Sequence, residues 1–225
     1  MKTLFLLGGG GAIGSAIKAL FIQQGYTVLA PRSRELDLSD SQAIVSYMEK
    51  FTSPVDALIF CAGHNDPAPI GQLTNQEIQK TYQINTASFA TLVAHLRKQF
   101  EQQKKGYILG ISSLYGSISR EGRAAYAMSK HAMNGLIQTL ALELGPHGIL
   151  CNTLSPGFVM TPMTQKNNTA QMIETLARQI PLGHLAAPED IARVAYFLCS
   201  EQNQYITGQD IVVDGGFMAG GFQHV

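Results

Sequence analysis

A chain of 225 residues is long enough for one sizeable α/β domain, and no Pro/Gly/Ser-rich linker or charge block marks a second, so we expect a single domain over residues 1–225. Sixteen basic residues balance sixteen acidic ones, which excludes an electrostatic case for a nucleic acid or membrane partner and favours a small molecule. The apolar run at residues 4–7 is too short for a signal-peptide core or a membrane span, so a cytoplasmic protein is expected.

The chain begins with an apolar strand pattern at residues 3–7, a run of glycines, and a helical pattern over residues 15–24. Glycines allow a backbone to approach a pyrophosphate closely, and a helix N-terminus offers free N–H groups to it. The turn matches the dinucleotide pattern G-x-G-x-x-G at the start of a strand-turn-helix unit. The residues expected to hold the phosphates are Gly8, Gly9, Gly11, Ile13 and Gly14.

A second strand is expected at residues 26–30, and a dinucleotide-binding protein reads the adenosine ribose at the end of such a strand. Arg32 and Ser33 follow Pro31 there, a cation and a hydroxyl that suit a 2′-phosphate. NADP(H) is therefore the favoured cofactor, although a solvated turn would have the same composition. Glu35 keeps NAD(H) as an alternative, because an acidic residue at this place binds the ribose hydroxyl.

Strand and helix patterns alternate through the rest of the chain. Strands are expected at residues 55–60, 107–111 and 148–154, and helices at residues 41–51, 75–99, 123–143 and 188–200. This alternation predicts an α/β fold, a doubly wound and mostly parallel sheet with helices on both faces. Ligands would bind at the carboxyl ends of its strands.

The segment that carries the chemistry runs from Ser113 to Lys130. Tyr126 and Lys130 are one helical turn apart, so they share a face of the helix, and the ammonium is expected to lower the pKa of the tyrosine towards neutrality. Ser113 follows a strand, where its hydroxyl could hydrogen-bond the same substrate oxygen. A tyrosine in this setting can pass a proton to or from a carbonyl or alcohol.

Ser113, Gly116, Tyr126 and Lys130, together with the glycine turn, resemble the catalytic segment of the short-chain dehydrogenase/reductase family. These are Rossmann-fold, NAD(P)-dependent oxidoreductases, and the resemblance extends over essentially the whole chain, with residues 210–213 matching the last strand of the family. It implies a seven-stranded sheet and a homotetramer or homodimer built partly through the helix that carries Tyr126. Asp37 follows the second strand so soon that the helix and strand usual before it are shortened or missing.

The resemblance also implies roles for residues that the patterns alone do not assign. Asn85 would bend its helix and hold a water that contacts Lys130, making Asn85, Ser113, Tyr126 and Lys130 the catalytic set. Tyr126 and Lys130 would also contact the cofactor. The other cofactor contacts that the resemblance implies are Asp37, Leu38, Ala62, Gly63, Pro156, Gly157, Val159 and Thr161. Cys61 stands where the family usually has asparagine.

The expected activity is hydride transfer between a nicotinamide and a carbonyl or secondary alcohol, with Tyr126 as general acid and base. The alternative is a dinucleotide sensor that binds cofactor without turnover. Residues 162–187 are expected to form a substrate lid, with Met163, Met172 and Leu176 suited to an apolar or mixed ligand. No metal site is expected, and the sequence leaves the substrate open.

Overall fold

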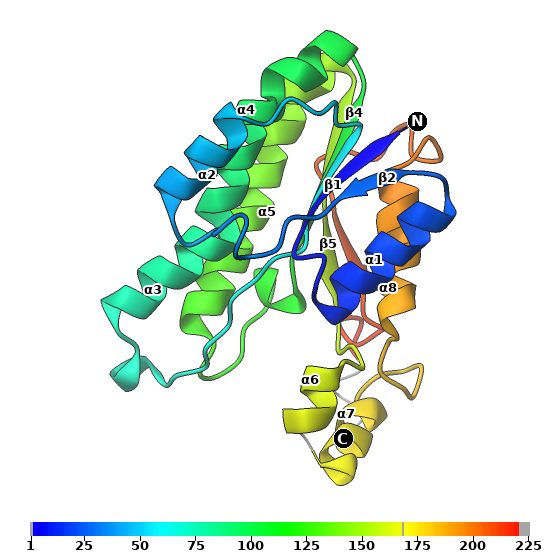
Figure 1. Ribbon diagram of the computed structural model, residues 1–225. Coiled ribbons are helices and arrows are strands. Elements are labelled where there is room, and N and C mark those ends of the chain that lie inside the picture. The colour runs from blue at the N-terminus through cyan, green and yellow to red at the C-terminus, as the bar shows by residue number, and fades with distance from the viewer. Residues whose placement is uncertain (1, 168, 221–225) are drawn as a thin grey trace.

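The computed structural model describes residues 2–167 and 169–220, and it shows one sheet between two layers of helices (Figure 1). All strands are parallel, and their order across the sheet is β2-β1-β3-β4-β5-β6. The strands are β1 Thr3–Leu7, β2 Thr27–Leu29, β3 Ala57–Phe60, β4 Gly106–Ile111, β5 Ile149–Pro156 and β6 Asp210–Val213. The prediction of a doubly wound Rossmann-type α/β fold is confirmed.

Helices α1 and α8 cover one face of the sheet, and α2, α4 and α5 cover the other (Figure 1). The two helices α6 and α7 lie beyond the carboxyl ends of the strands. The helices are α1 Ala12–Gln23, α2 Ser41–Glu49, α3 Asn75–Tyr82, α4 Ser88–Gln103, α5 Ala124–Leu144, α6 Pro162–Asn167, α7 Ala170–Arg178 and α8 Pro188–Leu198. Short turns of other helix types are η1 Ile70–Gln72, η2 Gln83–Ala87, η3 Leu114–Gly116 and η4 Gly145–His147.

The sheet is apolar on both faces because successive side chains of a strand point to opposite sides. In β1, Leu4 and Leu6 pack with α1 and α8, whereas Phe5 and Leu7 pack with the helices on the other face. All four side chains are buried. Two cores therefore fix the sheet from both sides, and the strand ends that carry the site are held rigidly.

The prediction of seven strands is wrong, since the described residues form six. After β2 the chain has only residues 30–40 before α2, and a crossover to a further parallel strand needs about a dozen residues or more. The chain instead passes through α2 to β3, which pairs with the other side of β1. The shortened turn that the sequence shows before Asp37 therefore makes β2 an edge strand.

The helix predicted over residues 75–99 is interrupted. The segment Gln83–Ala87, which contains Asn85, is a π-helical turn between α3 and α4. Such turns are rare and are often found at functional sites. No helix among residues 2–167 and 169–220 is long and apolar enough to cross a membrane.

Candidate active site

The turn between β1 and α1 is a cradle that only glycine can form. Gly8 has a φ of 81°, and a Cβ there would lie 2.5 Å from the backbone nitrogen of Ala62. A Cβ on Gly14 would lie 2.2 Å from the carbonyl oxygen of Gly8. Helix α1 has no side-chain cap and no acidic residue in its first turn. Its first N–H groups are therefore available to an anion that approaches the glycines.

Two neighbouring cavities, of about 810 and 770 Å³, extend from this cradle and share Gly10, Gly11, Cys61, Ala62 and Gly63. The first is also lined by Gly8, Gly9, Arg32, Ser33, Asp37 and Leu38. The second is also lined by Ile13, Gly14, Ser113, Tyr126, Lys130, Pro156, Gly157, Val159 and Thr161. Every cofactor contact expected from the sequence thus borders one continuous space, with the helix N-terminus at its middle. This shape and the glycine cradle fit a dinucleotide.

Tyr126 and Ser113 both line the second cavity, and Ser113 acts to lower the pKa of the Tyr126 phenol. The Oγ atom of Ser113 accepts the N–H of Tyr115 at 3.2 Å, which leaves the serine proton for the tyrosine oxygen. The Nζ atom of Lys130 lies 5.6 Å from the centre of the Tyr126 ring and donates to the carbonyl of Ile111 at 2.7 Å. Helix α5 and the end of β4 thereby bring the three side chains together.

The expected lowering of the Tyr126 pKa is not what the structure shows. Burial raises the pKa of Tyr126 to about 12, while the hydrogen bond from Ser113 and the charge of Arg123 act in the opposite direction. Burial lowers the pKa of Lys130 itself to about 8, and its ammonium donates to the Ile111 carbonyl. At neutral pH the phenol of Tyr126 therefore carries its proton, and the raised pKa makes it a weaker acid than an ordinary tyrosine in the cofactor-free site.

Asn85 is fully buried and does not line either cavity. Its Oδ1 atom accepts the N–H of His64 at 2.7 Å, and its Nδ2 atom donates to the His64 carbonyl and to Ser129 Oγ, both at 2.9 Å. A Cβ on Gly63 would lie 3.8 Å from this Oδ1 and 4.0 Å from Lys130 Nζ. Asn85 thus ties the loop after β3 to α5 beside the lysine, and its relay role remains a prediction.

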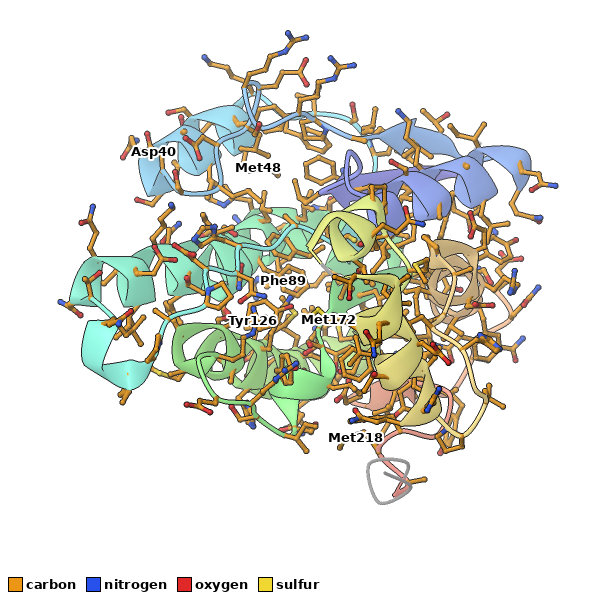
Figure 2. All side chains as sticks on the ribbon, turned by 90° about the horizontal axis from the view of Figure 1, so that it is seen from below. Asp40, Met48, Phe89, Tyr126, Met172 and Met218 are labelled. Carbon is orange, nitrogen blue, oxygen red and sulfur yellow. The ribbon has the colours of Figure 1, made fainter. Side chains whose placement is uncertain are left out.

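A third cavity, of about 720 Å³, opens beside Ser113. Met172 and Leu176 of α7 line it, opposite Phe158 and Phe217. Figure 2 looks from the side of α6 and α7 and labels Tyr126 and Met172 near the middle of that view. The predicted lid therefore contributes to a pocket of mixed polar and apolar lining that shares Ser113 with the second cavity. Residue 168 and the side chain of Met163 lie outside the described part of the lid.

The sequence analysis did not identify two features near the site. Lys18 of α1 lines the first cavity, and its spacing of seven residues from Gly11 could have indicated this. The Nε2 atom of His64 lies 2.6 Å from Oε1 of Glu77, and no sequence pattern links this pair. Within residues 2–167 and 169–220, no three His, Cys, Asp or Glu side chains are placed to hold a metal ion.

The buried Lys130 should make stability depend on pH in a defined direction. Its pKa is about 8 in the folded protein and ordinarily 10.5, so between these values the unfolded chain binds more protons. Stability attributable to this group is therefore lowest below pH 8 and rises towards pH 10.5. Relative to Lys130→Met, the wild type should gain on the order of 1–3 kcal/mol between about pH 7 and about pH 10. Urea unfolding of both proteins measures this, and parallel pH curves would contradict it.

Comparisons with known proteins agree with this geometry. The family model described as enoyl-(acyl carrier protein) reductase matches residues 16–218. The chain is 33% identical to human (3R)-3-hydroxyacyl-CoA dehydrogenase, over 93% of this chain and 92% of that protein. It is 32% identical to the 3-oxoacyl-acyl-carrier-protein reductase FabG of Rickettsia conorii, over 96% and 97% of the two chains.

A solved structure with the same fold is a Beutenbergia cavernae protein that is described as a candidate NAD(P)-dependent gluconate 5-dehydrogenase with bound NADP. Its TM-score is 0.91 at 29% identity, and the match covers 97% of both chains.

Proposed function

Because this chain belongs to the short-chain dehydrogenase/reductase family, we propose that it is an NADP(H)-dependent reductase of 3-oxoacyl thioesters, with Tyr126 as the general acid. The observation that carries the proposal is that Ser113, Tyr126 and Lys130 line one cavity, with Lys130 against the tyrosine ring, where that cavity meets the pocket lined by α7. The names of the two relatives support an acyl thioester, and a pocket lined by Met172 and Leu176 suits an acyl chain.

Reduction of a carbonyl needs a hydride and a proton. A bound nicotinamide supplies the hydride, and the phenol of Tyr126 donates the proton to the carbonyl oxygen as negative charge develops on it. The hydroxyl of Ser113 donates a hydrogen bond to the same oxygen. Lys130 lies against the ring of Tyr126 and holds it in place. Asn85 would position the loop after β3 and the relay water through which the phenol is protonated again.

The glycine cradle and the first turn of α1 would hold the pyrophosphate of the cofactor. Asp37 and Leu38 would border the adenine, while Arg32 and Ser33 would meet the 2′-phosphate. Ala62 and Gly63 would line the ribose, and the nicotinamide would lie against the segment that follows β5, which is Pro156, Gly157, Val159 and Thr161. Glu35, the residue that favours NAD(H), accepts the backbone N–H of Arg32 at 2.7 Å and does not line the first cavity.

Arg32→Ala should reduce the preference for NADPH over NADH by about tenfold to hundredfold, since a charge-assisted hydrogen bond contributes about 1.5–3 kcal/mol. Arg34→Ala is the matched control, because Arg34 is in the same turn but does not line the cavity. The dissociation constants of NADPH and NADH are measured by fluorescence titration for the wild type and both variants. Equal binding of NADH and NADPH by the wild type, or an unchanged ratio in Arg32→Ala, would refute the assignment.

The enzymatic proposal is tested by mixing the protein with NADPH and an acetoacetyl thioester and following nicotinamide absorbance. Turnover that depends on Tyr126 supports a reductase. Tight NADPH binding without hydride transfer to any of a panel of ketones and thioesters would favour the alternative, a non-catalytic sensor.

We also propose a homodimer or homotetramer formed in part through α5. Met128 and Leu142 of this helix are 56% and 80% exposed, and at fourteen residues apart they lie near one face. Exposed apolar side chains grouped on a helix favour a protein partner. A single domain over residues 1–225 and a cytoplasmic location remain predictions.

A further inference from the structure

Lys18 lines the same cavity as Arg32 and Ser33, although it comes from α1 and they come from the turn after β2. It is exposed, and within residues 2–167 and 169–220 no hydrogen bond or ion pair engages its ammonium group. A cation without an acidic partner on the wall of the proposed cofactor cavity is a feature that the proposed catalysis does not use.

The position of Lys18 on α1 directs its side chain towards the first cavity. The buried face of this helix is formed by Gly14, Ile17 and Phe21. Lys18 is seven residues after Gly11, which precedes the first turn of the helix, so the two lie on nearly the same side. Long side chains in helices lean towards the N-terminus. This places Lys18 on the wall of the first cavity, which Arg32 and Ser33 also line.

The charges around the first cavity favour a group with more negative charge than a ribose hydroxyl. Lys18 and Arg32 border it from two separate elements. The acidic residue that also lines it, Asp37, has its Oδ1 atom bonded to the N–H and the hydroxyl of Ser39, at 2.9 and 2.7 Å. No strand lies beyond β2 among the described residues, so only the short turn of residues 30–40 borders the cavity next to β2. A second cation from α1 would add a contact to the few that this turn can make.

We propose that Lys18 is a specificity-determining residue that binds the adenosine 2′-phosphate of NADP(H) together with Arg32. This inference rests on the NADP(H) preference proposed above. A 2′-phosphate held between cations from α1 and from the turn would be bound from two sides, and NADH would lack that contact.

The test is a titration of wild type, Lys18→Met and Lys50→Met with NADPH and NADH, and with the fragments 2′,5′-ADP and 5′-ADP. Methionine keeps the helix propensity and length of the side chain and removes the charge. Lys18→Met should weaken the binding of NADPH and of 2′,5′-ADP about tenfold and leave the binding of NADH and of 5′-ADP unchanged. Lys50→Met, whose lysine lines neither this cavity nor the second, should change none of them.

The possible results separate this inference from the proposed function. If the wild type prefers NADPH and Lys18→Met keeps that preference, Lys18 is not a determinant, although the NADP(H) assignment stands. If Lys18→Met weakens all four ligands equally, the lysine acts on the shared pyrophosphate or on the fold, and the inference is wrong. If the wild type binds both members of each pair equally, the cofactor assignment and this inference fail together.

A double variant with Arg32→Ala adds a second readout. Two cations on one phosphate should be coupled, so the effects on NADPH binding should not be additive. Additive effects would indicate separate contacts and would overturn the shared phosphate site.

Discussion

Tyr126→Phe should lower kcat by about 10²–10⁴-fold, the usual contribution of general acid catalysis, and should leave the affinity for NADPH unchanged. The phenol lines the same cavity as Ser113, and it carries its proton at neutral pH because burial raises its pKa to about 12. Phenylalanine retains the ring that packs edge-on against Tyr115, with ring centres 6.3 Å apart, so only the proton donor is removed. Steady-state kinetics with a 3-oxoacyl thioester, and an NADPH titration, measure the two effects.

The control for this variant is Tyr205→Phe, because Tyr205 is 97% exposed and borders none of the three cavities of the site. It should keep the wild-type rate. Near-normal turnover by Tyr126→Phe would remove Tyr126 from the mechanism. A parallel loss of NADPH affinity would show instead that the hydroxyl supports cofactor binding.

Gly14→Ala should weaken NADPH binding by about tenfold to hundredfold, the equivalent of an overpacking cost of about 1–3 kcal/mol. The new Cβ would lie 2.2 Å from the Gly8 carbonyl oxygen and 2.9 Å from Gly9 Cα, and both are backbone atoms that cannot rotate away. The start of α1 must therefore move from the glycine turn, which displaces the N–H groups intended for the pyrophosphate. Cofactor titration and thermal unfolding together report the effect.

Gly10→Ala is the companion variant for stability. A Cβ on Gly10 meets no atom within 4 Å, so the unfolding temperature should stay at the wild-type value. An unfolding temperature and an NADPH affinity equal to those of the wild type would contradict the prediction for Gly14→Ala.

The sequence predicts the parts of the fold that depend on local pattern. Residues 3–7 were expected as a strand and are β1 with the same bounds. A buried parallel strand has a nearly continuous apolar run, and that signal is carried by the strand itself. The seventh strand was expected only from the family resemblance, whereas the short segment between β2 and α2 already argued against it.

Other features depend on contacts between distant segments, which periodicity does not report. The π turn around Asn85 is such a feature, because its side chain bonds to His64 and Ser129 in two other elements. The direction of the Tyr126 pKa shift was wrong for a similar reason. Helical spacing brings Lys130 near the ring, but burial of the phenol by distant segments has the largest effect on its pKa.

The loss of a strand outside β2 also bears on how this protein avoids aggregation. An exposed sheet edge can pair with another chain, and a long, flat edge is a hazard. Here the edge strand has only three residues, Thr27–Leu29, and Pro31, which has no N–H to donate, follows two residues later. We expect so short a ladder to nucleate intermolecular β-pairing poorly. The shortened segment after β2 therefore leaves a sheet edge that offers few backbone groups for pairing with a second chain.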